Sequence, residues 1–487
     1  MFKSVLIETL RALSRQEMKE LGLFIQSPFF NTNQSVMGLF EQLRKLYPLF
    51  EENKLNKKLL FENAFGKIKY NDSFMRMTSF RLLELAKEFL IYKNLQRNNF
   101  VKETLLIDEL NFRELNNLML KSISEADKKM KKLKAKHPDV YFAEYRLEYF
   151  KNDIKARDTK MITYKDSLNK DLMMEQKSLN TYFFISSLKF FQYYLNQKTF
   201  VVNAGGYPDF VNEIIEYLGL HKEYLTNPVL NAYYLLVLML ISKDDKYFFG
   251  LKKILFEDNG SLSHVEKYNL VTVLRNYGSQ KYLEGSKEFN ENVFDILKFS
   301  VGKGLITSTP EGKYINENRF THIAGMGLRA KDYEWVKGFL KKYLDKIEPD
   351  KRNYIFAFNS AWLEFEKGNF TDALEYLGKS GQIKNVFYKA EIKHLTLMIY
   401  YELKWFIPAA DLLDAFRHFI KTDKLLPEMY VNQNNAFANF YGRLLKLNNQ
   451  TGNNSFEIAK LVKELRATSQ KWLLKKAMEL KEKTISS

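Results

Sequence analysis

The residues best suited to chemistry in this chain are few and widely separated. Glu391 and His394 form a Glu-x-x-His pair, a spacing that places a carboxylate and an imidazole on one face of a helix. Carboxylate-bridged metal centres in helical bundles need two such pairs and additional glutamates. Only one pair occurs here, so the sequence does not predict a metal ion. The chain has no cysteine, which excludes thiol chemistry and disulfides.

Nucleotide and acyl-transfer signatures are also missing from the sequence. Lys303 lies between Gly302 and Gly304 but lacks the spacing of a phosphate-binding loop, and no strand is expected before it. No G-x-S-x-G elbow occurs. We therefore predict a protein that is not an enzyme, with no catalytic residue, no cofactor and no bound metal.

A lysine-rich segment is the strongest local charge feature. Its position predicts the solvated C-terminal end of a helix, where the helix dipole favours cations. The alternative is a contact with a phosphate backbone, which the net charge of +17 also allows. Nucleic acid is therefore the second choice of partner, after protein or peptide. The basic patch comprises Lys128, Lys129, Lys131, Lys132, Lys134 and Lys136.

The elements that carry these residues are predicted to be helices throughout. No glycine occurs between Gly66 and Gly205, the chain has nine prolines, and no alternating strand pattern is evident. Aromatic residues make up 15% of the chain. Such rings bridge neighbouring helices in a core, and the alternative is that they line a groove for a peptide. The fold class is all-α.

Residues 1–97 are predicted to form a compact N-terminal helical module. Ser14 and Glu17 make a capping box for a helix that ends near Gln26, before Pro28. Further helices are expected over residues 34–46, over 57–65, and from Asn71 or Asp72 onward. The apolar stripe of that last helix comprises Met75, Phe80, Leu83, Leu85 and Phe89. Residues 98–312 are predicted to form an irregular array of long helices, three of them before residue 200, with breaks at His137-Pro138 and Gly205-Gly206.

A repeated pattern begins after residue 312. Aromatic residues recur at Tyr333, Phe370 and Phe406, at intervals of 37 and 36 residues, each following a predicted turn between two helices. A helix pair cannot bury its own apolar face, so such pairs must stack. The positions that recur in phase are Val336, Ala373 and Ala409; Leu340, Leu377 and Leu413; and Leu328, Phe365 and Tyr401.

The segment 313–450 resembles the tetratricopeptide repeat family, most closely between Asn353 and Ser380. The matching positions are Ala361, Gly368, Phe370, Ala373 and Leu377, whereas the tyrosine position of the family's first helix holds Gly327, Glu364 and Tyr400. The resemblance implies a right-handed solenoid of helical hairpins, followed by C-terminal capping helices over 451–487. The whole chain also resembles large helical bacterial proteins, a likeness that implies no activity.

The resemblance implies that the first helix of each pair lines a concave face. We therefore hypothesise a protein-protein interaction scaffold that binds a peptide or protein there. The partner-binding candidates are Asn318, Arg329, Phe358, Trp362, Glu366, Glu391, His394, Met398 and Tyr401. The alternative function is a nucleic-acid-associated regulator, in which helices around Leu59 and Arg76 form a helix-turn-helix-like module and the solenoid is a sensor.

The sequence also predicts a cytoplasmic protein without membrane insertion. Glu8 and Arg11 interrupt the apolar N-terminal residues, which argues against a signal peptide. The longest apolar run, residues 232–241, is shorter than the roughly 20 residues that a membrane-spanning helix needs.

Overall fold

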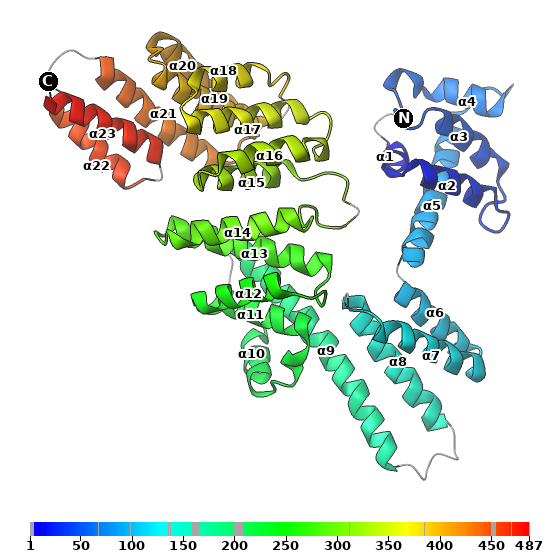
Figure 1. The fold of residues 1–487 in the computed structure, drawn as a ribbon. Helices are drawn as coiled ribbons and strands as arrows, with labels where there is room; N and C mark the ends of the chain where they lie inside the picture. Colours follow the sequence, from blue (N-terminus) through cyan, green and yellow to red (C-terminus); the bar gives the residue numbers. More distant parts are fainter. Residues whose placement is uncertain are drawn as a thin grey trace. The chain divides into compact units, whose positions relative to one another are not determined.

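The structure, a computed structural model, is built from helices (Figure 1). It describes residues 4–66, 68–97, 99–134, 136, 138–157, 165–198, 208–310, 312–383, 385–423, 425–449, 454–468 and 470–486. Within these ranges no strand occurs, which confirms the all-α prediction. The chain divides into two compact units, Met1–Ser186 and Ser187–Ser487, and each is described by itself. The four-part division predicted from the sequence stays a prediction.

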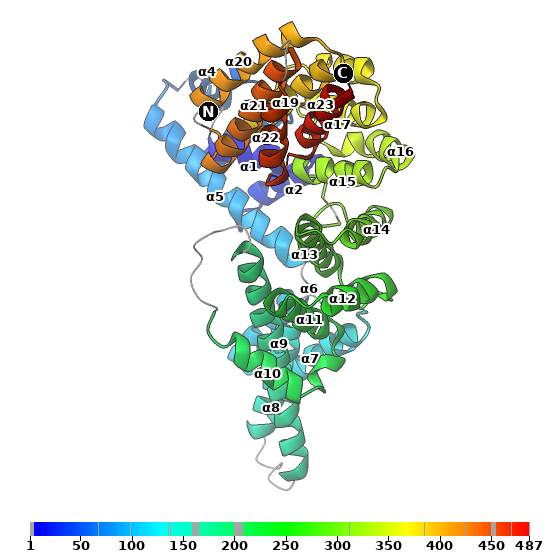
Figure 2. The same ribbon diagram turned by 90° about the vertical axis from the view of Figure 1, so that its left-hand side faces the viewer.

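The first helices of unit 1 share one core. The capping box is present: Ser14 Oγ accepts from the Glu17 amide and Glu17 Oε2 from the Ser14 amide. Phe80, predicted to be in the apolar stripe, is instead 62% exposed, since the buried stripe runs through Met75, Leu82 and Phe89. The helices are α1 (Val5–Ala12), α2 (Arg15–Gln26), α3 (Gln34–Lys45), α4 (Lys57–Phe65) and α5 (Asp72–Arg97). The last extends past the others (Figure 2).

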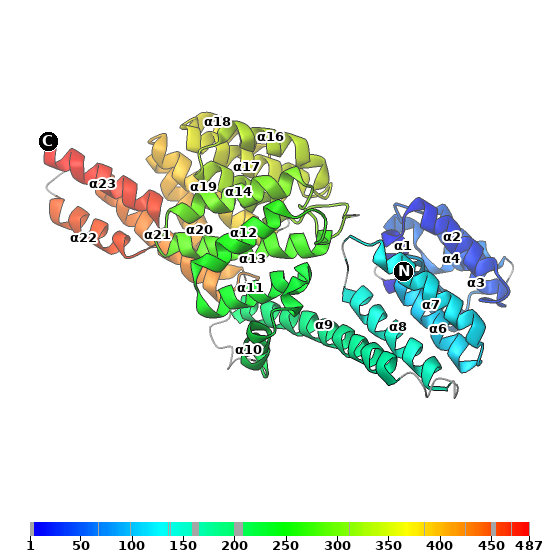
Figure 3. The same cartoon turned by 60° about the horizontal axis from the view of Figure 1, so that its bottom comes forward.

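The rest of unit 1 has one more helix than predicted. A turn at Glu114, whose φ is 57°, divides the first expected long helix into two helices that pack on each other (Figure 3). His137, where a break was expected, lies outside the described residues, and the next helix begins at Pro138. These helices are α6 (Asn99–Phe112), α7 (Asn116–Lys131), α8 (Pro138–Arg157) and α9 (Lys165–Lys198), the last of which continues into unit 2.

Unit 2 is a succession of helix pairs with a continuous core from Val293 to Ala477. Gly205 and Gly206 lie outside the described residues. None of the helices in the described ranges combines the length and apolar character needed to cross a bilayer. The helices are α10 (Val211–Leu220), α11 (Pro228–Ser242), α12 (Asp245–Glu257), α13 (His264–Leu283), α14 (Glu288–Gly302), α15 (Glu317–Arg329), α16 (Tyr333–Tyr343), α17 (Arg352–Lys367), α18 (Phe370–Gly378), α19 (Val386–Glu402), α20 (Phe406–Thr422), α21 (Glu428–Asn449), α22 (Ser455–Arg466) and α23 (Lys471–Ser486).

Three of these pairs are joined by the same turn. Tyr333, Phe370 and Phe406 are the first residues of α16, α18 and α20, in agreement with the predicted phase. Before each, one residue has a left-handed backbone, with φ of 59° at Lys331, 85° at Gly368 and 59° at Lys404.

The hydrogen bonds of the turn repeat as well. The amide after each left-handed residue donates to the carbonyl five positions earlier: Asp332 to Gly327, Asn369 to Glu364 and Trp405 to Tyr400, at 3.1, 2.8 and 2.8 Å. This is the Schellman end of a helix, which fixes the direction in which the next helix starts. Leu115 and Leu110 make the same bond, at 2.9 Å, between α6 and α7 in unit 1.

Small residues set the distance between the helices of a pair. Val336, Ala373 and Ala409 are fully buried at equivalent positions. At Gly327, where the resembled family carries tyrosine, an added Cβ would lie 2.5 Å from Cγ2 of Val336. The approach of α15 to α16 therefore depends on the missing side chain.

The C-terminal helices cover the end of α19 (Figure 1). Tyr441 of α21 donates to the Leu397 carbonyl at 2.6 Å, and Trp472 of α23 donates to Glu402 at 2.8 Å. Lys476 forms an ion pair with the same carboxylate at 2.8 Å. The helix pairs thus end in a polar and aromatic contact rather than in an open apolar face.

The shared turn predicts opposite effects for two glycine substitutions. Gly368→Ala should lower the free energy of unfolding by about 1 kcal/mol, because alanine resists a left-handed backbone. Gly338→Ala, within α16 and facing open space, should raise it by about 0.5–1 kcal/mol. Denaturant unfolding of both variants tests this. Equal effects of the two substitutions would contradict the turn assignment.

Candidate functional site

A cavity of about 670 Å³ opens between the helices of unit 2. Residues of α15, α17, α19 and α21 line it. Six predicted partner-binding candidates meet there: Asn318, Arg329, Phe358, Trp362, Glu366 and Glu391. The sequence reasoning missed the other lining residues, which are Thr321, His322, Gly325, Met326, Leu328, Asn359, Phe387, Tyr388 and Tyr430.

Helical spacing explains how residues far apart in sequence meet. On α15, residues 318, 322, 325 and 329 follow one another at intervals of four, three and four, which is one face of a helix. Residues 358, 362 and 366 form the corresponding face of α17. His322 and Gly325 lie between the predicted Asn318 and Arg329 on this face, so helical spacing alone would have found them from the sequence.

The other three predicted residues do not line this cavity. His394 packs on Phe437 of α21, with ring centroids 3.6 Å apart. Met398 is 4% exposed, and Tyr401 is 9% exposed between Tyr441 and Trp472. The prediction assumed an open groove along all of α19, whereas the C-terminal helices cover its second half.

A polar network centred on Glu317 ties together three of the four helices that line the cavity. Tyr354 of α17 donates to Glu317 Oε2 at 2.8 Å, and Asn385, which caps α19, donates to Oε1 at 2.6 Å. The Tyr388 hydroxyl lies 2.9 Å from Thr321 Oγ1 and 3.2 Å from the Glu317 carbonyl. Because its hydrogen bonds join α15 to α17 and to α19, the network fixes the relative positions of these cavity walls.

Aromatic rings form much of the wall. Phe358 meets Tyr388 edge to face at a centroid distance of 5.5 Å, and Trp362 lies 6.4 Å from Phe358. Across the cavity, Phe387 of α19 meets Tyr430 of α21 at 4.9 Å. Rings in such contacts are held in place and can offer an apolar surface without large rearrangement.

Two titratable groups in the cavity have no polar partner among the described residues. Glu391 is half-buried, and burial raises the pKa of its carboxyl group. Nε2 of His322 is buried and makes no hydrogen bond. Burial and the nearby Arg275, Arg329 and Arg319 lower the pKa of His322 to about 3, so its imidazole is neutral at pH 7. Buried polar groups without a hydrogen-bond partner in the protein are suited to contact a ligand.

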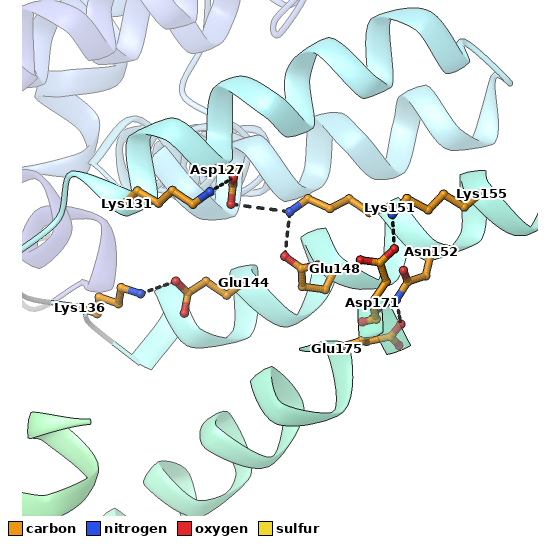
Figure 4. Close-up of polar contacts among 10 residues, drawn as sticks. All are labelled: Asp127, Lys131, Lys136, Glu144, Glu148, Lys151, Asn152, Lys155, Asp171 and Glu175. Carbon is orange, nitrogen blue, oxygen red and sulfur yellow. Dashed lines mark hydrogen bonds and ion pairs between the residues drawn. The ribbon is translucent and has the colours of Figure 1, made fainter. Parts of the chain in front are cut away.

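The predicted basic patch is partly neutralised by unit 1 itself. Lys131 forms an ion pair with Asp127 at 2.8 Å, and Lys136 with Glu144 (Figure 4). Lys129 forms an ion pair with Glu103. Lys128, Lys132 and Lys134 are exposed. The carboxylates interleaved with these lysines reduce the positive potential that a phosphate backbone would meet.

Acidic residues also connect the neighbouring helices of unit 1. Asn152 of α8 donates to Glu175 of α9 at 2.7 Å, and Lys155 forms an ion pair with Asp171 (Figure 4). Lys151 bridges Glu148 and Asp127 at 2.7 and 3.6 Å. The charged residues here therefore hold α7, α8 and α9 together.

The residues of the alternative helix-turn-helix-like module lie on α4 and α5. Leu59 is 47% exposed, and Arg76 pairs with Asp72 one turn earlier at 3.1 Å. Lys57 reaches the same carboxylate at 3.3 Å. Asp72 thus neutralises part of the charge that this module would offer to nucleic acid.

Neither a family model nor any curated protein or solved structure matches the chain. In the part of the chain that the structure describes, no group of three or more His, Asp or Glu side chains is arranged to hold a metal ion. The cavity is therefore the feature from which a function can be inferred.

The buried histidines predict a pH dependence of stability. Burial lowers the folded-state pKa of His322 to about 3 and of His394 to about 4, whereas an unfolded histidine has a pKa of about 6.5. The free energy of unfolding is therefore highest above pH 6.5 and falls below it, because only the unfolded chain binds a proton at these histidines. Each histidine should lower the free energy of unfolding by up to about 2 kcal/mol between pH 6.5 and 5.

Denaturant unfolding at pH 7 and pH 5 measures this difference. His322→Asn should reduce it, whereas His418→Asn, at an exposed position of α20, should leave it unchanged. An unaltered difference in His322→Asn would show that this imidazole is protonated in the folded protein.

Proposed function

We propose that unit 2 is a right-handed, tetratricopeptide-like solenoid that acts as a non-enzymatic, cytoplasmic scaffold and binds a peptide segment of a partner protein in the α15–α21 cavity. The observation that carries this proposal is the convergence of four helices on a cavity with both ring surfaces and polar groups that lack partners. The recurring turn of α15–α16, α17–α18 and α19–α20 supports the solenoid.

The size and chemistry of the cavity fit a short peptide segment. Its volume of about 670 Å³ lies within the roughly 300–1,000 Å³ typical of ligand pockets. Phe358, Trp362 and Tyr430 offer surfaces for apolar side chains. Glu391 and His322 offer hydrogen-bonding groups that the protein itself does not satisfy. Recognition would combine a ring-lined surface with a few directional polar contacts.

A nucleic-acid regulator is less well supported. The lysines at the end of α7 are interleaved with carboxylates, and Asp72 lies beside the basic residues of α4 and α5. Glu366 and Glu391 line the cavity of unit 2 and would repel a phosphate backbone.

Filling the cavity should abolish peptide binding without harming the fold. A Cβ added at Gly325 meets no atom within 4 Å, and the residue lines the cavity, so Gly325→Leu adds bulk to the cavity lining from a position with room for its Cβ. Peptides selected on the full chain from a random display library should bind Gly325→Leu at least about tenfold more weakly, a loss of about 1.4 kcal/mol. Fluorescence anisotropy measures the affinity.

Gly338→Leu is the matched control. Gly338 also faces open space but lies on α16, away from the cavity, so this variant should bind like the unmodified protein. Equal binding by both variants, or a selection that enriches no peptide, would overturn the proposal.

A further inference from the structure

Three arginines close enough to influence His322 have no acidic partner among the residues that the structure describes. Arg319 of α15 is 6% exposed. Its guanidinium donates to the Leu305 carbonyl at 2.9 Å and to Thr272 Oγ1 at 3.3 Å, and lies 4.2 Å from the centre of the Tyr268 ring. Its Nε is buried and has no hydrogen-bond partner among the described residues. No carboxylate among the described residues neutralises this charge.

Arg275 of α13 adds a second such charge. It is half-buried, and both its Nε and its Nη2 donate to Oδ1 of the adjacent Asn276, at 3.3 and 3.0 Å. Burial and the nearby Arg319 lower the pKa of Arg275 to about 10. The group is therefore still protonated at pH 7, and two like charges remain close together.

His322 connects these arginines to the cavity. It lines the cavity, and its buried Nε2 lies within the electrostatic reach of Arg275, Arg319 and Arg329. Arg329 is exposed on the same face of α15, and its guanidinium contacts only the sulfur of Met326, at 3.6 Å, among the described residues. Arg329 thus lines the cavity itself, whereas Arg275 and Arg319 act on its His322 wall through their charge, and the imidazole is neutral.

Three other buried or half-buried cations of unit 2 do have acidic partners. Lys189 pairs with Glu266 at 2.7 Å, Lys267 with Asp258 at 2.7 Å and Lys476 with Glu402 at 2.8 Å. Removing a charge from water costs several kcal/mol unless a counter-charge replaces the lost hydration. The arginines beside the cavity depart from this pattern, which indicates that their counter-charge comes from a ligand.

We infer that the wall around His322 binds an oxyanion carried by a side chain of the bound peptide, either a phosphate or a carboxylate. This inference rests on the proposed function and specifies its ligand as an acidic peptide. Arg329, which lines the cavity, is the direct donor, since guanidinium groups bind such oxyanions in a bidentate manner. Arg275, whose guanidinium donates to Asn276, contributes positive charge close to His322. Arg319, whose Nη atoms are already engaged, contributes charge and holds the wall in place.

The rest of the cavity restricts the ligand to a single anionic group. Phe358 and Trp362 on α17 line the same cavity and can contact an apolar residue next to the charged side chain in the peptide. Glu391 on α19 makes no hydrogen bond or ion pair with the described residues and favours a hydrogen-bond donor such as a peptide amide or an ammonium group. A polyanion would meet this carboxylate and that of Glu366, whereas a peptide with one oxyanion would not.

Small probes test the oxyanion subsite by isothermal titration calorimetry on the full chain. Phenyl phosphate and hydrocinnamate carry a phosphate and a carboxylate next to a ring, and benzyl alcohol carries no charge. At least one anionic probe should bind at least about tenfold more tightly than benzyl alcohol. If the protein binds phenyl phosphate more tightly than hydrocinnamate, the ligand is a phosphorylated side chain. If it binds the two anions equally, a carboxylate is sufficient for binding. Benzyl alcohol binding as tightly as both anions would overturn the inference.

Charge-removing variants locate the subsite. Arg275→Gln and Arg329→Gln should each weaken the anionic probe at least about tenfold. Lys337→Gln removes the same charge from an exposed position of α16 and should leave the affinity unchanged. Because Arg329 is exposed, its substitution does not depend on repacking a core. Affinities that are the same in all three variants would overturn the inference.

Peptides separate this inference from the proposed function. A display-selected peptide that Gly325→Leu excludes but Arg275→Gln binds normally would leave the scaffold standing and refute the oxyanion subsite. Conversely, if binding of the anionic probes requires Arg275 but no peptide is selected, the oxyanion subsite would stand and the peptide-binding scaffold would be refuted. A single-stranded oligonucleotide that displaces phenyl phosphate and requires Arg275 would refute the assignment to a peptide.

Discussion

Unit 2 depends on one packing constraint: the two helices of each pair must approach closely enough to bury a shared apolar face, and successive pairs must stack to cover what remains. Val336, Ala373 and Ala409 allow that approach, and a left-handed residue before each second helix sets its direction. The stacking aligns α15, α17 and α19, and only because they are aligned do Glu317, Tyr354 and Tyr388 meet. The cavity walls follow from this arrangement.

Local signals in the sequence were sufficient for many helix boundaries and for the phase of the pairs. The capping residue Ser14, the terminating Gly66 and the aromatic residues that open α16, α18 and α20 act within one or two helical turns, so they can be read without knowing the fold. The turn at Glu114 was missed because its left-handed residue is not glycine and, unlike Lys331 and Lys404, it lies outside the recurring aromatic pattern.

The candidate site was predictable only in part, because it combines two kinds of position. Phe358, Trp362 and Glu366 lie on one helical face and follow from spacing alone. Tyr401 was misplaced because α23, far along the chain, covers it through Trp472. The arginine group could not be predicted, because its defining property is that no acidic residue of the described structure pairs with Arg275 or Arg319. The residues next to these arginines in the sequence do not reveal this.

The shared turn has a consequence for how such a chain changes length. Each of the three hairpins from α15 to α20 turns from its first helix into its second with the same backbone geometry, so duplication or loss of one whole pair leaves the turns of the remaining pairs unchanged. The same turn between α6 and α7 shows that the unit of construction is the hairpin rather than the repeat sequence. A lineage can therefore lengthen the array by whole hairpins while keeping a binding cavity at one place within it.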